Sequence, residues 1–197
     1  MRFNRTFWIT SIFIFGVGIF CQFFTAKVEA TVWANAHNGH YLDIFFHFYT
    51  QVVEWPLLFI SLGLLLYRDW FSGLIAGIFF AFEGILVNVL KRFFNAPRPI
   101  IENGTLFAAA GEVVHRHFSF PSGHTSAAFF GFGLLSCITQ NRFMGILYAV
   151  LAALIGYSRM YLGQHYLKDV LAGESLGLLL LFTFVKLLPK IQNKFYK

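Results

Sequence analysis

The segment Ser158-Arg159-Met160-Tyr161-Leu162-Gly163-Gln164-His165-Tyr166-Leu167-Lys168-Asp169 places an arginine, a histidine and an aspartate in an otherwise apolar part of the chain. Charged groups inside or at the edge of a membrane are costly and are usually functional. If residues 165 to 169 are helical, His165 and Asp169 lie one turn apart on one face. The carboxylate can then bond to one ring nitrogen and leave the other as a nucleophile. This segment predicts half of a covalent-catalysis site.

Two upstream clusters supply positive charge and neutral hydrogen-bond donors. Their members are Lys91, Arg98, Pro99, Pro121, Ser122, Gly123 and His124. Arg98 and Arg159 can each fork onto phosphate oxygens, and Ser122 and the Gly123 amide add donors at the start of an apolar helix. These groups, with the Lys91 ammonium, predict an oxyanion pocket. His124 is suited to protonating a departing oxygen.

At these positions the chain resembles the type 2 phosphatidic acid phosphatase (PAP2) superfamily, whose motifs read K-x6-RP, PSGH and SR-x5-H-x3-D. All three occur in order, as Lys91-x6-Arg98-Pro99, Pro121-Ser122-Gly123-His124 and Ser158-Arg159-x5-His165-x3-Asp169. The resemblance covers residues 70–185, and no catalytic position departs from the pattern.

The resemblance implies a mechanism. His165, oriented by Asp169, attacks phosphorus to give a phosphohistidine, and His124 protonates the leaving group. The residues implied to hold the phosphate oxygens are Lys91, Arg98, Ser122, Gly123 and Arg159. The family mechanism needs no metal and no other cofactor, since fixed cations stabilise the charge.

Composition points independently to the membrane. The 197 residues are 57% hydrophobic, 20% aromatic and only 12% charged, with a mean hydropathy of +0.64, whereas soluble domains carry about 25% charged residues. Apolar runs long enough to span the hydrocarbon core as helices occur at 7–25, 45–66, 71–92, 122–140, 143–161 and 168–188. The runs do not alternate as barrel strands would. We therefore expect an all-α polytopic membrane protein of about six transmembrane helices, forming one domain over residues 1–197.

Alternating spans bring the motifs to one face of the membrane, because Lys91 ends the third span, Ser122 begins the fourth, Arg159 ends the fifth and Asp169 begins the sixth. The opposite face carries Arg2, Arg5, Arg68, Arg142, Lys190, Lys194 and Lys197. The positive-inside rule assigns that face to the cytoplasm. We expect a bacterial inner-membrane protein whose site faces the periplasm or exterior. Basic residues on the active face oppose this orientation; they are Lys27, Arg92, Arg116 and Lys168.

The first apolar stretch follows Arg2 and Arg5 and resembles a secretory signal, with Val28-Glu29-Ala30 as a poor cleavage sequence. It is longer than the apolar core of about 7 to 15 residues that such signals have. An uncleaved first helix is favoured.

Several other residues receive structural interpretations. Small residues at helical spacing predict close helix packing; they are Gly73, Gly77, Ala127, Ala128, Gly131, Gly173 and Gly177. Cys21 and Cys137 lie within predicted spans and are expected to be packing residues. The four tryptophans Trp8, Trp33, Trp55 and Trp70 are predicted interfacial anchors. Basic residues form no exposed face apart from the short C-terminal tail, which argues against nucleic-acid binding.

Two long connections, 25–44 and 95–120, lie on the active face and are expected to shape the site's entrance. His115-x-His117 in the second has no third ligand at convincing spacing, so headgroup contact or plain surface is favoured over a metal site. Glu83 and Asn88 interrupt the third span. Glu83 either lines a cavity and tunes Lys91 or forms a hydrogen bond between helices.

The favoured function is hydrolysis of a phosphate or pyrophosphate on a lipid that stays in the bilayer. The resemblance offers undecaprenyl pyrophosphate, phosphatidylglycerophosphate, phosphatidate or lipid A phosphate, with undecaprenyl pyrophosphate placed first. A lipid-to-lipid phosphotransferase using the same intermediate is the first alternative. A non-catalytic lipid-binding protein is the second, although it would be expected to have lost His165, His124 or Asp169. The sequence leaves the oligomeric state open.

Overall fold

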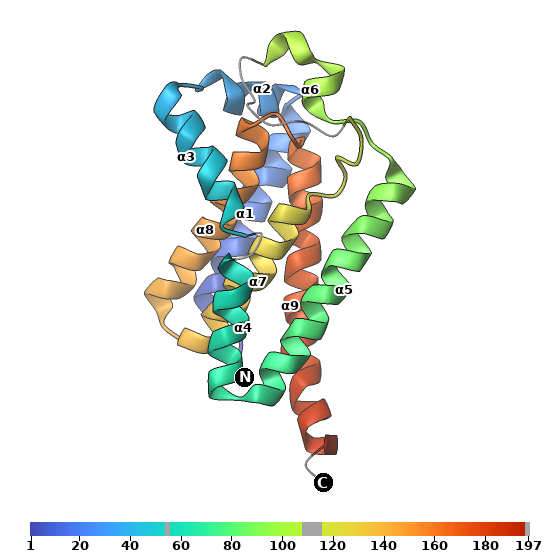
Figure 1. Ribbon diagram of the computed structural model, residues 1–197. Helices are drawn as coiled ribbons and strands as arrows, with labels where there is room; N and C mark the ends of the chain where they lie inside the picture. The colour runs from blue at the N-terminus through green and yellow to red at the C-terminus, as the bar shows by residue number, and fades with distance from the viewer. Residues whose placement is uncertain (54–55, 108–115, 196–197) are drawn as a thin grey trace.

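The computed structural model describes residues 1–53, 56–107 and 116–195, and within these ranges every regular element is a helix (Figure 1). The elements are α1 (Arg5–Phe24), α2 (Glu29–Ala36), α3 (His40–Gln51), α4 (Pro56–Arg68), α5 (Trp70–Phe94), α6 (Pro99–Glu102), the 3₁₀ helix η1 (Gly104–Leu106), α7 (Gly123–Thr139), α8 (Arg142–Tyr161) and α9 (Leu167–Phe195). The all-α prediction is confirmed.

Five candidate membrane spans are long and apolar enough to cross a bilayer, counted over the described residues. They are Arg5–Phe24, His40–Arg68, Trp70–Glu102, Arg142–Tyr161 and Leu167–Phe195. The sixth expected span corresponds to α7, which has 17 residues, at the lower end of the range of about 17 to 25 residues for a spanning helix. Most of α7 is buried by its neighbours. Its apolar character therefore reflects the interior of the bundle more than contact with lipid.

The predicted second span, 45–66, lies within the candidate span His40–Arg68, which contains two helices. Helix α3 ends at Gln51 and α4 begins at Pro56, and Pro favours a helix start because its ring fixes φ and removes the N–H. Trp55 lies outside the described residues. The connection predicted at 25–44 is largely helical, since it contains α2 and the start of α3.

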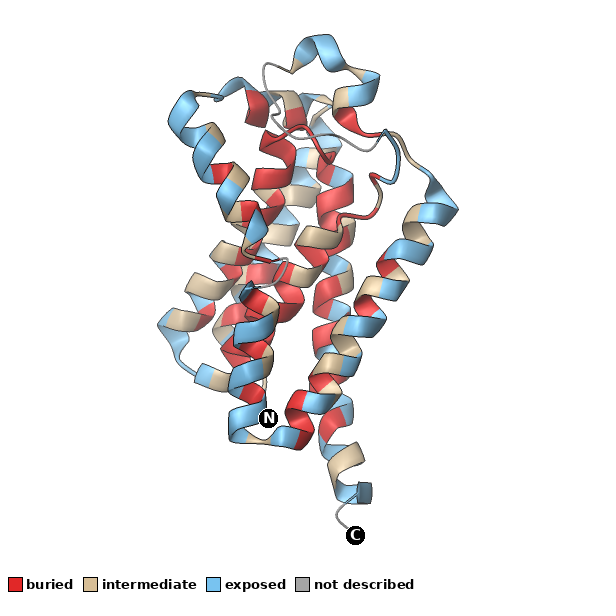
Figure 2. Ribbon diagram, viewed as in Figure 1, coloured by how far each residue is buried: buried red, intermediate tan, exposed pale blue. Residues whose placement is uncertain are grey.

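Helix α7 lies at the centre of the bundle. It packs against α8 and α9, α1 covers α8, and the α4–α5 hairpin closes another side. Figure 2 shows that burial is concentrated in α7, α8 and α9, whereas α5 is exposed along one side. Helix α5 leans away from α9 toward its C-terminal end (Figure 1), which is the end that carries Lys91.

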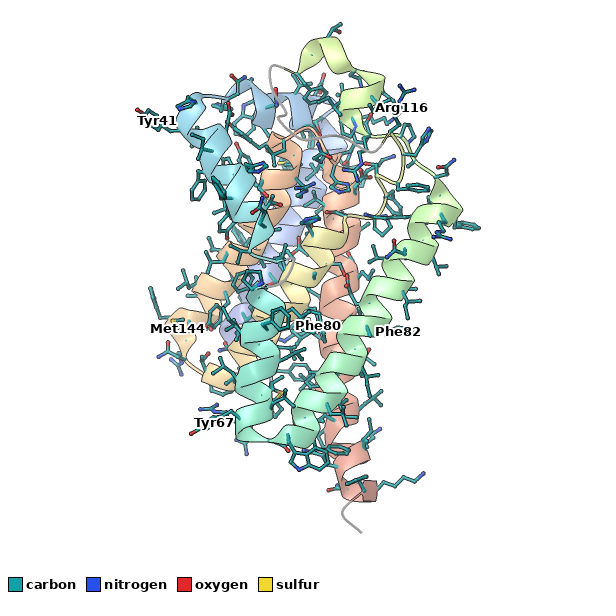
Figure 3. All side chains as sticks on the ribbon, in the orientation of Figure 1. Tyr41, Tyr67, Phe80, Phe82, Arg116 and Met144 are labelled. Carbon is teal, nitrogen blue, oxygen red and sulfur yellow. The ribbon has the colours of Figure 1, made fainter. Side chains whose placement is uncertain are left out.

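The outer faces of the helices are apolar. Figure 3 shows Phe82 projecting outward from α5, where its side chain is exposed, whereas Phe80 packs on Phe130 of α7 with ring centroids 4.7 Å apart. Large exposed aromatic and aliphatic side chains recur on α1, α3 and α4. Such a surface is stable in lipid and not in water. The apolar helices identify an integral membrane protein.

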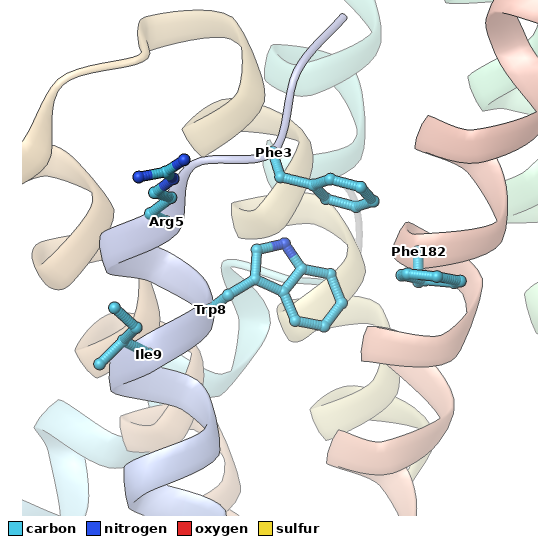
Figure 4. A pocket seen from close by; sticks show the side chains of 5 residues that line it. All are labelled: Phe3, Arg5, Trp8, Ile9 and Phe182. Carbon is cyan, nitrogen blue, oxygen red and sulfur yellow. The ribbon is translucent and has the colours of Figure 1, made fainter.

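Helix α1 is fixed at the end of the bundle that holds both termini (Figure 1). The Asn4 side chain caps α1 and its Nδ2 donates to the backbone oxygens of Ser136 and Asn141 at 3.2 and 3.0 Å. Figure 4 shows Trp8 beside Phe3 and Phe182. The rings of Phe3 and Phe182 stack with their centroids 5.6 Å apart, and all three residues line a hollow of about 400 Å³. Trp8 is thus a packing residue of the α1–α9 contact.

Helix α9 approaches α7 closely. A Cβ on Gly173 would lie 2.4 Å from the backbone oxygen of Ser122, and one on Gly177 would lie 2.4 Å from that of Ser126. Both glycines are therefore required for this packing. Gly73 and Gly131 also face tight contacts, as predicted, whereas Gly77 has ordinary space around it.

We expect Gly173→Ala to destabilise the protein by about 1 to 3 kcal/mol, the usual cost of overpacking a rigid interior. The added methyl group would meet a backbone oxygen, which cannot rotate away. Thermal unfolding in detergent measures the effect. Gly16→Ala is the matched control, because no atom lies within 4 Å of its new methyl group. Equal melting temperatures for the two variants would contradict the packing argument.

Candidate active site

The three motif segments meet at the end of the bundle opposite the termini. Arg98 precedes α6, Ser122 is the N-cap of α7, and Arg159 lies in the last turn of α8. The backbone N–H of Ser122 donates to the backbone oxygen of Asp169 at 2.9 Å, and the Arg98 side chain donates to the Gln164 side chain. All eight predicted site residues therefore come from one end of the molecule.

His165 lies in a tight turn between α8 and α9. The turn contains Gly163 at φ 65°, a left-handed conformation that favours glycine. The backbone N–H groups of Gln164 and His165 both donate to the oxygen of Arg159, at 2.9 and 3.2 Å. Because α9 begins only at Leu167, the predicted helical geometry for residues 165–169 is wrong at its start, and the turn instead positions the imidazole.

His165 and Asp169 are nevertheless neighbours. Nδ1 of His165 lies 3.7 Å from Oδ2 of Asp169, which is long for a direct hydrogen bond. The Ser119 hydroxyl lies between them, 2.5 Å from Oδ2 and 3.5 Å from Nδ1. The backbone N–H of Tyr166 also donates to Oδ2, at 3.0 Å. Since Nδ1 faces this network, we expect Nε2 to be the nitrogen that attacks.

His165 is 1% exposed. Burial lowers its pKa to about 4, and the nearby guanidinium groups of Arg159 and Arg98 act in the same direction, against the effect of Asp169. The imidazole is therefore neutral at pH 7. A neutral ring has a lone pair to donate, which a nucleophile requires.

Both candidate arginines are buried and held by polar partners. Arg98 is bonded to the Gln164 side chain, and its Nε donates to the backbone oxygen of His117 at 3.4 Å. Nη1 of Arg159 donates to Oγ1 of Thr50 on α3 at 2.9 Å. Buried guanidinium groups fixed in this way are preorganised to bind oxyanions.

Lys91 and His124 line a cavity of about 380 Å³ between α5 and α7, together with Gly123 and Glu83. A Cβ on Gly123 would lie 3.8 Å from Nζ of Lys91, so the lysine ammonium approaches the start of α7. The first N–H groups of a helix lack intrahelical acceptors and attract anions. The Ser122 hydroxyl accepts from Thr125 as the helix cap and keeps its own proton to donate.

Three residues of the site were not predicted. Ser119, Gln164 and Thr50 contact predicted site residues directly. Gln164 immediately precedes His165, and Ser119 lies three residues before Ser122, so proximity to the motifs was an available signal for both. Nothing in the sequence marked Thr50 as a site residue, because only the folded chain brings α3 beside Arg159.

The remaining predictions for the long connections have mixed outcomes. His115 and Glu112 lie outside the described residues, while the backbone oxygen of His117 supports Arg98. Over the described part of the chain, no three His, Cys, Asp or Glu side chains cluster as metal ligands. Glu83 lines the cavity beside Lys91 and also lies near the Ser126 hydroxyl of α7, so the structure does not choose between its two interpretations.

Comparison with protein families gives a match to the PAP2 superfamily over residues 72–193. The chain belongs to the PAP2 superfamily. The match covers the three motifs and the helices that carry them, so the predicted resemblance is confirmed.

Individual relatives agree with this assignment. The chain is 35% identical to phosphatidylglycerophosphatase B of Bacillus subtilis over 136 residues, which are 64% of this chain and 63% of the relative. The chain spans about half to two thirds of the length of the first curated relatives it matches.

Solved structures are also similar. The crystal structure of Aquifex aeolicus LpxE has a TM-score of 0.71 and 29% identity, covering 81% of this chain and 94% of that one. A transmembrane PAP2-type phosphatidylglycerolphosphate phosphatase from Bacillus subtilis has a TM-score of 0.69 and 27% identity, covering 97% of this chain and 98% of that one. The similarity to transmembrane members agrees with the apolar outer surface.

The arrangement of cations predicts that the protein binds orthovanadate or inorganic phosphate without any lipid. We expect saturating vanadate to raise the melting temperature of the wild-type protein, because a ligand at about 100 times its Kd stabilises the folded state by about 2.7 kcal/mol. The rise should disappear in Arg98→Gln. Arg68→Gln is the control, since Arg68 lies on the α4 turn and bonds to Ile138. An undiminished rise in Arg98→Gln would exclude Arg98 from the anion site.

Proposed function

We propose that this protein is a membrane phosphatase that hydrolyses a phosphate or pyrophosphate group on a lipid through a phosphohistidine. The observation that carries the proposal is the buried, neutral His165, backed by Ser119 and Asp169, at the end of the bundle where Arg98 and Arg159 also lie. The names of the relatives support a lipid phosphate as substrate.

In the first step, Nε2 of His165 attacks phosphorus while the bond from phosphorus to the leaving oxygen breaks. Protonated His124 gives its proton to that oxygen. Burial and the nearby cations lower the pKa of His124, and the dianionic phosphate beside it acts in the opposite direction and favours the protonated form. Asp169 and Ser119 stabilise the positive charge that develops on His165. Lys91, Arg98 and Arg159, with the donors of Ser122 and Gly123, stabilise the phosphoryl oxygens.

In the second step, water attacks the phosphohistidine. Neutral His124 takes a proton from the water, the nitrogen–phosphorus bond breaks, and inorganic phosphate leaves with His165 restored. Every charge that the reaction develops has a partner in this chain. The proposed mechanism therefore routes no step through a metal.

Phosphate release by the purified protein from a panel of lipid phosphates, in detergent with excess EDTA, tests this function. We expect turnover to survive the chelator and to be inhibited by vanadate, which can adopt the five-coordinate geometry of the transferring group. His165→Ala should lower turnover by more than about a thousandfold, as loss of a nucleophile does. Retention of a tenth of the wild-type rate would contradict the role of His165.

We expect Ser119→Ala to lower kcat by about 10- to 100-fold with little change in KM, because the hydroxyl orients the nucleophile and does not bind substrate. Asp169→Asn should show the same pattern. Ser11→Ala is the matched control: Ser11 is equally buried and its hydroxyl has no hydrogen-bond partner within the described chain. Wild-type kcat in Ser119→Ala would show that the serine is only structural.

We further propose that the site faces the periplasm or exterior of a bacterial inner membrane, on the charge argument. In a Cys21→Ser background, cysteines replacing Gly39 and Asn103 should react with an impermeant thiol reagent in intact cells. A cysteine replacing Asn193 should react only after the membrane is opened. Cys21 is exposed, contrary to the packing role expected for it, and is therefore replaced, whereas Cys137 is buried and should not react. The reverse labelling pattern would place the site in the cytoplasm.

A further inference from the structure

The cavity beside the candidate phosphate site contains a polar region that the proposed chemistry does not use. Glu83 and Asn88 of α5 line it together with Lys91, Gly123 and His124. The Glu83 side chain is 6% exposed and its carboxyl lies near the Ser126 hydroxyl of α7, but its Oε1 has no hydrogen-bond partner within 3.5 Å among the described residues. A buried carboxyl oxygen without a partner is costly. A bound ligand that supplies the partner would remove this cost.

The position of Glu83 defines which part of a substrate it meets. Glu83 precedes Lys91 by two helical turns, about 12 Å along the axis, and side chains in helices lean toward the N-terminus. The Lys91 ammonium therefore lies on the Glu83 side of its own Cα. When the phosphate is at Lys91, the atoms attached to it lie between Lys91 and Glu83, deeper in the bilayer.

Lipid phosphates differ in chemistry at this depth. In a glycerolipid, ester carbonyls or a hydroxyl follow the phosphate within a few bonds, whereas in a polyprenyl phosphate only hydrocarbon follows. A carboxylic acid can donate to a carbonyl, and a carboxylate can accept from a hydroxyl or a bridging water. A glycerol backbone thus satisfies Glu83 in either protonation state. A polyprenyl chain leaves it buried and unpaired, and sites with unpaired polar groups reject ligands strongly.

We propose that Glu83 is a specificity-determining residue that recognises the polar backbone of a glycerolipid phosphate and disfavours polyprenyl phosphates. This inference rests on the proposed phosphatase function and names the substrate class of the same site. It reverses the order of substrates expected from the sequence, in which undecaprenyl pyrophosphate came first.

The experiment compares two phosphomonoesters, phosphatidate and undecaprenyl phosphate, so that the reacting group is the same. We expect wild-type kcat/KM to favour phosphatidate by at least about tenfold, the value of one hydrogen bond. Glu83→Leu should reduce this preference about tenfold, whereas Glu83→Gln, which still forms hydrogen bonds, should keep most of it.

Glu174→Leu is the matched control. Glu174, on α9, is likewise a buried carboxyl: it is 2% exposed and its Oε1 has no partner among the described residues. It lines a separate apolar crevice between α1, α8 and α9. Its replacement should leave the preference unchanged within about twofold. A loss of the same size in Glu174→Leu would make the Glu83 effect a general consequence of removing a buried carboxyl, and would overturn the inference.

The remaining outcomes separate the inference from the function beneath it. A wild-type protein that releases phosphate from neither lipid would refute the proposed function itself. A wild-type protein that is active but indifferent to the two lipids would overturn the inference alone, and this measurement does not depend on whether Glu83→Leu folds. An equal loss on both lipids in Glu83→Leu would make Glu83 a support for Lys91, and would also overturn it.

Discussion

The candidate site depends on how closely α9 approaches α7. The missing side chain of Gly173 lets α9 lie against the backbone of Ser122, and the Ser122 N–H then donates to the oxygen of Asp169 at 2.9 Å. One contact therefore joins the residue that caps the anion-binding helix to the residue that orients the candidate nucleophile. A side chain at position 173 would push the segment that carries Ser122 away from the segment that carries Asp169, although it would change no candidate catalytic group itself.

The same constraint explains why α7 is short and buried. Helix α7 needs to present only its N-terminus to the site, and it is enclosed by the helices that carry the other groups. Its first turn is thus fixed on several sides, which favours precise positioning of backbone donors. Helix α5 is held less tightly and leans away from α9. The side of the bundle that carries Lys91 and Glu83 is consequently the side with the cavity.

The helices and the convergence of the motif residues at one end of the bundle were predictable from the sequence. Continuous apolar runs predicted helices, and alternation of spans predicted that Lys91, Ser122, Arg159 and Asp169 meet at one end. The details came from tertiary contacts that have no local signal. Pro56 was a visible signal for the start of a helix within the second span. The hydrogen bond of Arg159 to Thr50 on α3 had no such signal. Nor did the position of the Ser119 hydroxyl between Nδ1 of His165 and Oδ2 of Asp169, because only the folded bundle brings these side chains together.

Two buried carboxyl groups, Asp169 on α9 and Glu83 on α5, have different surroundings. Ser119 and the backbone N–H of Tyr166 both donate to Oδ2 of Asp169, whereas its Oδ1 has no hydrogen-bond partner among the described residues. Glu83 likewise has one oxygen without a donor, Oε1, but it borders the cavity in which we propose that the substrate lies. A buried carboxyl oxygen without a donor costs free energy until something binds, and of these two oxygens the one on Glu83 belongs to a residue that lines the cavity. In the proposed mechanism Asp169 therefore orients the nucleophile, and in our further inference Glu83 selects the lipid.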